Sequence, residues 1–367
     1  MDVYLNGVGH YIPGFIYSND DLSRLMGVDI EKGRRYGALL GVESRSSCMD
    51  LTNGRKQAIA CDEMAWCAAE AALADAGLSA SDVDVVICCS SFFDFMSPSI
   101  SSRLLKRLGL ESAQTYDLMG GCAEFLHGLH LARLMIESGQ ASTILVTASE
   151  VITAWWAQVR HPLEFYIFGD AGGAFVLSGR PGLAKIRGSF VRTDAKVGGQ
   201  PAELICVPIL GGKAEAPLFY ENYESSPLCD QLSDIPARYR IVHNGAQVGF
   251  AAPLAMAEAV KRSLGDADVA PTDVFVVPHQ ASRNVLSLLA KETKVPENQV
   301  GISLGWRGNM STASIPVTMH DHRNAALASP NLVLTSVGVG MSYGAMLLEP
   351  TPVQAPSPGG RGEALFA

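Results

Sequence analysis

An internal repeat constrains the fold of this 367-residue chain more than any other feature of its sequence. An Ala-rich helical segment, a short polar turn and a Val-rich strand lead up to Cys89, and the same order recurs up to His279. With Leu73 aligned on Leu264, seven of the fourteen positions up to Val86 are identical. Helices that alternate with buried, Val-rich strands are typical of an α/β fold.

A second repeat supports the first. The segments GDAGGAFVL and GMSYGAMLL share Gly, Gly, Ala and Leu at four matching positions. Because both repeats occur in the same order, we predict two similar α/β halves, at residues 1–180 and 241–350. Residues 181–240 carry Gly and Pro without periodicity, which predicts a connecting or cap segment, and the Pro/Gly-rich tail 351–367 is predicted to be disordered.

Composition disfavours several functional classes. A net charge of −9 argues against nucleic-acid binding, which needs a basic face. The eight cysteines lack metal-site spacing, and we expect them to be reduced. No apolar run approaches the roughly 18 residues of a membrane span, and the N-terminus does not resemble a signal peptide. We therefore expect a cytoplasmic protein with no membrane contact, no metal and a small molecule or a protein as partner.

Cys122 is the first candidate for chemistry. In DLMGGCAEFLHG it follows two glycines where a strand-like run gives way to a helical one. Free N–H groups at a helix N-terminus lower the pKa of a thiol and can donate to an oxyanion on an attached acyl group. The pattern therefore indicates a nucleophile, although a small core residue at a tight turn is an equally weighted alternative.

Two further polar residues lie on turns of the same kind. His279 ends the strand DVFVVPHQ, at the carboxyl end where open α/β sheets place their sites. Asn309 lies in the glycine-flanked GWRGNMSTAS. A structural histidine and an asparagine that caps a turn are the alternatives. Together with Cys122 they form a Cys, His and Asn set.

The ordered motifs DLMGGCAEF, FGDAGGAFVL, VPHQAS, GNMSTASIP and GVGVGMSYGAML resemble those of β-ketoacyl-acyl-carrier-protein synthase III and its relatives in the thiolase superfamily. The resemblance runs from about residue 3 to residue 348. It implies an α/β thiolase fold, five-layered αβαβα and built from two similar halves. It also implies a homodimer and an enzyme that binds no cofactor.

The resemblance also implies roles for the candidate residues. Cys122 would accept an acyl group from a thioester of coenzyme A or acyl carrier protein. His279 and Asn309 would hold the thioester carbonyl of a malonyl-type donor and stabilise the enolate formed by decarboxylation. The backbone amides of Cys122, Val339 and Gly340 would bind the oxyanion of the acyl-transfer step.

The chain departs from the family pattern at several positions. Glu124 and Val339 stand where the family usually has Gly, and Ser282 stands where it has Asn. Asn284 replaces an Arg that contacts the nucleotide phosphates, and Arg35 falls near the position of a Trp that stacks on the adenine. These departures disfavour the usual mode of coenzyme A binding and favour loading from a carrier protein. Glu124, Ser282 and Arg35 are candidate substrate-binding residues, with a carboxylate that is turned away from the site as the alternative for Glu124.

The segment FFDFMSPSI resembles the loop that crosses the family's dimer interface and walls the partner's acyl pocket. It makes Phe95 and Met96 candidate substrate-binding residues, with ordinary interface core as the alternative.

The predicted function is decarboxylative Claisen condensation in fatty-acid-like or polyketide metabolism. An acyltransferase that passes the acyl group to an alcohol or amine, with His279 as general base, is the alternative. A papain-like protease also has Cys, His and Asn in this order, but Cys122 lacks the sequence context of that family.

Overall fold

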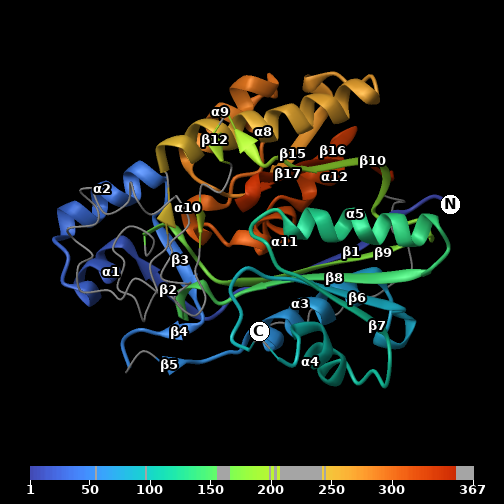
Figure 1. The fold of residues 1–367 in the computed structure, drawn as a ribbon, viewed down its shortest axis with the longest axis horizontal. Coiled ribbons are helices and arrows are strands. Elements are labelled where there is room, and N and C mark those ends of the chain that lie inside the picture. The colour runs from blue at the N-terminus through green and yellow to red at the C-terminus, as the bar shows by residue number, and fades with distance from the viewer. Residues whose placement is uncertain are drawn as a thin grey trace, which may run out of the picture.

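A computed structural model of the chain describes residues 1–53, 56–95, 97–154, 166–197, 200–201, 205–206, 242–243 and 245–352. Met96 and most of the predicted segments 181–240 and 351–367 lie outside this range. Figure 1 shows the helices and strands, coloured from blue at the N-terminus to red at the C-terminus.

The described chain is built on a nine-stranded sheet in the order β15-β16-β17-β10-β1-β9-β8-β6-β7. Within the first half, β6 is parallel to β7 and β8, and β8 is antiparallel to β9. Within the second half, β15 is parallel to β16, which is antiparallel to β17. The strands are β1 (Tyr4–Tyr11), β6 (Val85–Cys89), β7 (Gln114–Leu118), β8 (Thr143–Glu150), β9 (Ala171–Ser178), β10 (Ala184–Thr193), β15 (Val274–Pro278), β16 (Asn331–Gly338) and β17 (Ser342–Pro350).

The two halves of the sheet are joined through β1 and β10. This antiparallel pair has two opposed positions, Tyr4 with Lys185 and Leu5 with Ala184. Strand β10 lies within residues 181–240, which were predicted to be a connecting or cap segment. This segment therefore also contributes a full strand to the central sheet.

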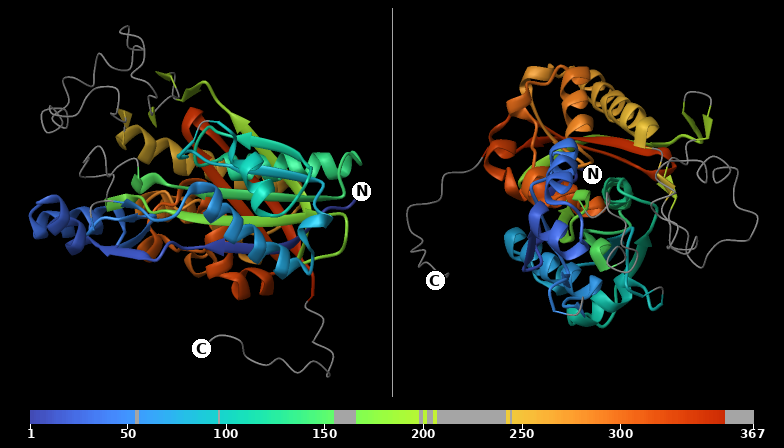
Figure 2. Two further views of the ribbon diagram at one scale, coloured as in Figure 1. Left: turned by 90° about the horizontal axis from the view of Figure 1, so that it is seen from below. Right: turned by 90° about the vertical axis from the view of Figure 1, so that its left-hand side faces the viewer.

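Helices cover and separate the two half-sheets (Figures 1 and 2). Helix α3 packs on β1, β8 and β9, and α8 packs on β16 and β17 at the opposite side of the molecule. Helices α5 and α11 lie between the half-sheets and contact strands of both. The layers therefore follow the order αβαβα. The helices are α1 (Asn19–Met26), α2 (Ile30–Leu40), α3 (Cys61–Ala76), α4 (Ile100–Arg107), α5 (Glu124–Glu137), α8 (Gly245–Asp266), α9 (Arg283–Thr293), α10 (Leu304–Arg307), α11 (Ser314–Asp321) and α12 (Arg323–Ala328).

Short elements complete the described fold. Single-turn helices are η1 (Ala80–Asp82), η4 (Pro271–Asp273), η5 (Glu297–Gln299), η6 (Ser311–Ala313) and η7 (Val339–Met341). The two-stranded pairs are β2 (Phe15–Ser18) with β3 (Ser44–Ser47), β4 (Met49–Asp50) with β5 (Lys56–Gln57), β11 (Lys196–Val197) with β12 (Gln200–Pro201), and β13 (Ile205–Cys206) with β14 (Val242–His243). No helix within the described ranges is both long enough and apolar enough to cross a lipid bilayer.

The predicted repeat is present as two sets of matching elements. Helix α3 and strand β6 correspond to α8 and β15, and β9 corresponds to β17. The sequence alignment of β6 with β15 is one residue out of register, however. Val85 faces the core between the half-sheets, whereas its aligned partner Val276 faces the outer core under α8. Aligning Phe275 with Val85 instead places both residues in the core between the half-sheets, because a shift of one residue turns every side chain of a strand to the other face.

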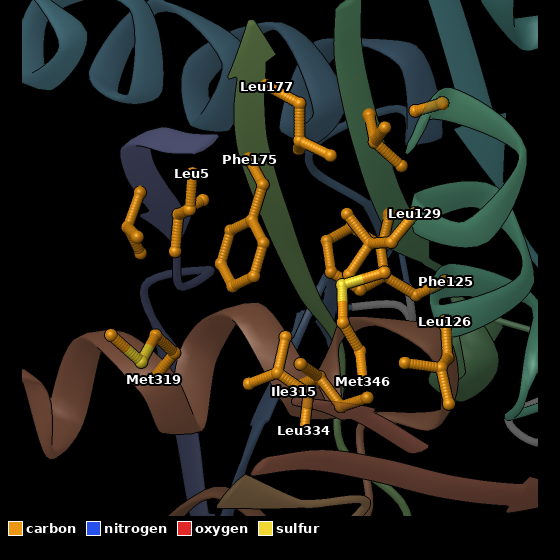
Figure 3. Close-up of a cluster of buried hydrophobic side chains, with 14 of the residues drawn as sticks. Leu5, Phe125, Leu126, Leu129, Phe175, Leu177, Ile315, Met319, Leu334 and Met346 are labelled. Carbon is orange, nitrogen blue, oxygen red and sulfur yellow. The ribbon is translucent and has the colours of Figure 1, made fainter. Parts of the chain in front are cut away.

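The core between the half-sheets is apolar and drawn from both repeats (Figure 3). Phe125 of α5 meets Phe175 of β9 edge to face, with 5.2 Å between ring centroids. Ile315 of α11 and Leu334 of β16 belong to the same cluster. This core fixes the distance between the turns that precede α5 and α11, and those turns carry the candidate site.

Candidate active site

The turn that carries Cys122 depends on a glycine beside it. Cys122 lies between β7 and α5, two residues before Glu124, the first residue of the helix. Gly121 has a φ of 127°, a conformation that residues with a side chain rarely adopt. A Cβ atom added there would lie 2.5 Å from the Val339 side chain. The GGC sequence is therefore needed for backbone shape as well as for close packing.

The second half of the chain packs directly on this turn. A Cβ atom at Gly338 would lie 2.7 Å from the backbone nitrogen of Ala123 and 3.0 Å from that of Cys122. Ser336 Oγ donates a 2.9 Å hydrogen bond to the Cys122 carbonyl oxygen. The turn predicted to supply oxyanion donors therefore lies beside the nucleophile turn. Gly340 does not pack on the nucleophile turn in this way, because a Cβ atom added there would lie nearest to Ser342.

His279 is buried immediately after β15, with 2% of its surface exposed. Its amide donates to the Thr335 carbonyl oxygen at 2.8 Å, and its Nδ1 lies 3.1 Å from Ser314 Oγ. Burial lowers the pKa of His279 to about 4. The imidazole is therefore neutral at neutral pH and carries one N–H donor.

Asn309 is held on both sides by backbone. Its amide donates to the Ile167 carbonyl oxygen at 2.7 Å, and its carbonyl oxygen accepts from the Gly169 amide at 3.0 Å. Its Oδ1 accepts a 2.9 Å hydrogen bond from the Ser311 amide, and its Nδ2 donates at 3.4 Å to the Ala281 carbonyl oxygen. The side-chain amide of Asn309 therefore contacts the loop that follows His279.

Ser311 joins the three predicted residues and was not predicted from the sequence. Its Oγ donates to Cys122 Sγ at 3.5 Å, and its amide bonds to Asn309. Its backbone also hydrogen-bonds to His279. The structure therefore brings Cys122, His279 and Asn309 together around Ser311. The one sequence signal for Ser311 is its place two residues after Asn309 in GNMSTAS.

The thiol of Cys122 does not have the lowered pKa that the sequence predicts. Burial is the largest influence and raises the pKa of Cys122 to about 11. Hydrogen bonds from Ser311 and from the residue's own amide lower this pKa, while the charges of Glu150 and Glu124 raise it. The prediction was wrong because it considered the helix N-terminus, which lowers the pKa of the thiol, but not desolvation. Desolvation raises this pKa and has the larger effect here.

Glu124 is half-buried and lies against the glycine turn. A Cβ atom at Gly120 would be 2.5 Å from Glu124 Oε1. Burial raises the pKa of the Glu124 carboxyl. Its charge also raises the pKa of Cys122, so this carboxylate opposes ionisation of the thiol.

Glu150 is a second buried acid near the sulfur and was also not predicted. It ends β8, and 0% of its surface is exposed. Its carboxylate accepts from the amides of Ser91, Phe92 and Thr312, and from Thr312 Oγ1 at 2.5 Å. Burial raises the pKa of Glu150 to about 7 despite these donors.

The remaining predicted residues lie elsewhere. Ser282 is the N-cap of α9, and its Oγ accepts a 3.5 Å hydrogen bond from the Val285 amide. Arg35 is exposed on α2. The Phe95 side chain is 56% exposed, with the Arg103 guanidinium 4.8 Å from its ring centroid. Among the described residues, no three His, Cys, Asp or Glu side chains are grouped so that they could hold a metal ion.

Comparisons with known proteins agree with the motifs. Residues 116–195 match the family described as 3-oxoacyl-[acyl-carrier-protein] synthase III, and residues 264–349 match its C-terminal part. The β-ketoacyl-[acyl-carrier-protein] synthase III of Rhodobacter capsulatus is 30% identical over 351 residues, which cover 94% of this chain and 98% of that protein. The Chlamydia pneumoniae protein of the same name is 27% identical over 93% of this chain and 95% of its own.

A solved structure extends the likeness to three dimensions. The 3-oxoacyl-(acyl carrier protein) synthase III of Pseudomonas aeruginosa PAO1 superimposes with a TM-score of 0.78 and 26% identity, over 95% of this chain and 98% of that one. The predicted thiolase fold is thereby confirmed. The chain is an enzyme of the β-ketoacyl-acyl-carrier-protein synthase III family.

Proposed function

We propose that this enzyme carries out a decarboxylative Claisen condensation between an acyl group on Cys122 and a malonyl-type donor on acyl carrier protein. The observation that carries the proposal is the convergence of Cys122, His279 and Asn309 around Ser311, from turns of both halves. Sulfur nucleophile and neutral donors are the groups that such a reaction needs.

In the loading step, the Cys122 sulfur attacks the carbonyl carbon of an acyl thioester. A new carbon–sulfur bond forms, the bond to the carrier thiol breaks, and the proton of Cys122 leaves with that thiol. Amides at the start of α5 and in the Gly338 turn would stabilise the oxyanion. The close packing of Gly338 against the amide of Cys122 supports this assignment, because it brings the two turns together.

In the condensation step, His279 and Asn309 donate to the thioester carbonyl of the malonyl-type donor. Loss of carbon dioxide leaves an enolate, whose carbon attacks the acyl group and releases the Cys122 thiolate. A neutral imidazole suits this role because it donates without protonating the enolate, and burial holds the pKa of His279 near 4. One such donor can contribute about 3 kcal/mol at best.

The proposal includes acyl donors on coenzyme A or carrier protein, a product of fatty-acid-like or polyketide metabolism, and a homodimer. Support for the dimer comes from β7, one of the two edge strands of the described sheet, since an edge strand leaves backbone groups open to pairing. Met119 directly follows β7 and is 57% exposed. An exposed apolar side chain beside an open edge suits a contact with a second copy.

One experiment tests the function. The protein is incubated with a panel of acyl-coenzyme A and acyl-carrier thioesters, and its intact mass is measured. We expect one acyl group on the wild type and none on Cys122→Ala. If no thioester labels Cys122, the proposal fails.

A second stage identifies the acceptor. Malonyl-carrier should give a β-ketoacyl product with the wild type, and His279→Ala and Asn309→Ala should load the acyl group but release little carbon dioxide. If an alcohol or amine takes the acyl group while malonyl-carrier is inert, the acyltransferase alternative is correct.

A further inference from the structure

Two serine hydroxyls form a chain that ends on the Cys122 sulfur. Ser91 Oγ lies 2.9 Å from Ser311 Oγ, and Ser311 Oγ donates to Cys122 Sγ at 3.5 Å. Ser91 follows β6 in the first half, and Ser311 begins η6 in the second. The sulfur is thus contacted by a polar group from outside its own turn.

The direction of this chain follows from the number of protons. A hydroxyl has a single proton, so Ser311 cannot donate to both the sulfur and Ser91. When Ser311 donates to the sulfur, Ser91 must donate to Ser311. Each hydrogen bond then polarises the next, which strengthens the bond to a thiolate.

Glu150 holds both ends of the hydroxyl pair. Its carboxylate accepts the Ser91 amide at 3.0 and 3.1 Å, and it accepts the amide of Thr312, next to Ser311, at 3.1 Å. These bonds fix two loops from opposite halves on one carboxylate. Ser311 is held at a φ of +47°, a left-handed conformation uncommon for a residue with a side chain.

We propose that the Ser311 hydroxyl stabilises the Cys122 thiolate by hydrogen bonding, and that Ser91 and Glu150 are positioning residues that hold this hydroxyl on the sulfur. The inference rests on the proposed function in taking Cys122 as the reactive thiol. It assigns Ser311 a role in the ionisation of the nucleophile, separate from the role of His279 and Asn309 in the second step.

The balance of groups around the sulfur explains why this donor is needed. Burial and the carboxylates of Glu150 and Glu124 all raise the pKa of Cys122. Among the side chains described around the thiol, Ser311 is the one whose hydrogen bond lowers that pKa. The hydroxyl therefore acts together with the amide of Cys122, and against burial and the two carboxylates, when the thiolate forms.

The test measures the reactivity of Cys122 without any acyl donor. Full-length wild type, Ser311→Ala and Ser311→Gly are treated with iodoacetamide between pH 7 and 9, and alkylation of the Cys122 peptide is followed by mass spectrometry. Loss of the donor should raise the thiol pKa by about one unit. A more basic thiolate is also more nucleophilic, so the rate should fall about threefold at each pH.

Two variants at the same position separate the hydroxyl from the backbone. Glycine suits the left-handed conformation of Ser311, whereas alanine keeps the strain. Equal slowing in both variants supports the proposal. Alkylation of both at the wild-type rate or faster overturns it, as does slowing in Ser311→Ala alone. Ser91→Ala should slow alkylation by a smaller factor, and an unchanged rate in that variant would refute the role of Ser91.

Ser90→Ala is the matched control. Ser90 is buried beside Ser91, but its hydroxyl donates to the Ser149 carbonyl oxygen at 2.7 Å. Its loss should leave the alkylation rate of Cys122 at the wild-type value. Because iodoacetamide needs only the thiol, a protein that no acyl thioester labels can still show the Ser311 effect, so the two proposals fail independently.

Discussion

Gly338 of the second half lies directly against Ala123 of the first, since a Cβ atom at Gly338 would be 2.7 Å from the Ala123 backbone nitrogen. The carboxyl end of β16 therefore meets the start of α5 with no room for a side chain. This contact joins the nucleophile turn to the turn proposed to supply oxyanion donors.

Gly338→Ala should impair acyl loading. The added methyl group must push the Cys122 turn away from β16, and a displacement of about 1 Å can cost about 100-fold in rate. The acylation rate by intact mass checks this. Gly188→Ala is the control, because a Cβ atom at Gly188 in β10 would meet no atom within 4 Å. Equal loading rates in both variants would contradict the prediction.

Gly121→Ala should destabilise the protein for two separable reasons. Its φ of 127° strains any residue with a Cβ, at a cost of about 1–3 kcal/mol, and the new Cβ would lie 2.5 Å from Val339. The double variant Gly121→Ala with Val339→Gly keeps the strained φ and removes the contact with the Val339 side chain, at the smaller cost of a more flexible residue 339. Chemical denaturation should therefore rank the unfolding free energy as wild type, then double variant, then Gly121→Ala. A double variant no more stable than Gly121→Ala would contradict the prediction, because relief of the contact would then gain no more than the glycine at position 339 costs.

Glu150 should make the stability of the protein depend on pH. Burial raises the pKa of Glu150 to about 7, so the folded chain keeps a proton there that the unfolded chain releases near pH 4.3. This contribution to stability is present at low pH and is lost as pH rises through about 7. Wild type should thus lose stability relative to Glu150→Gln between about pH 4.5 and 7, by at most about 1.4 kcal/mol per pH unit. Urea unfolding at several pH values measures this difference, and a constant difference would refute the raised pKa.

His279 should remain neutral at pH 6 and above. Burial lowers the pKa of His279 to about 4, below that of an exposed imidazole. The folded state therefore excludes a proton that the unfolded state binds, and the resulting stability is lost as pH falls from about 6.5 towards 4. Nitrogen NMR shifts of the labelled imidazole, assigned with His279→Gln, should report a neutral ring at pH 6. A midpoint near 6.5 would contradict the buried, neutral donor.

Much of the architecture can be predicted from the sequence, because each sequence repeat corresponds to the same helix and strand in both halves. The two copies of helix, turn and strand correspond to α3 with β6 and α8 with β15. The alignment was one residue out of register in the strand, because matching Val residues occur on both faces of a strand buried on both sides. Identity alone could not distinguish the face of Val85 from that of Val276.

The local motifs predicted where Cys122, His279 and Asn309 lie, but not what surrounds them. Ser91 and Ser311 are 220 positions apart in the chain, and neither belongs to a motif that signals the other. The pKa of Cys122 was missed for the same reason. Ser311, Ser336 and Gly338 of the second half pack against the turn and contribute to the burial of the thiol, and a local pattern does not contain those contacts.

Helices α5 and α11 keep the two half-sheets apart, and Cys122 precedes one of these helices while Asn309 and Ser311 precede the other. The thickness of this middle layer therefore sets the spacing between the sulfur and its donors. A larger or smaller side chain at Phe125 or Ile315, both buried in the layer, would change that spacing without altering any group at the site. The reaction rate should therefore depend on the volume of apolar side chains that are buried in this layer, away from the sulfur and its donors.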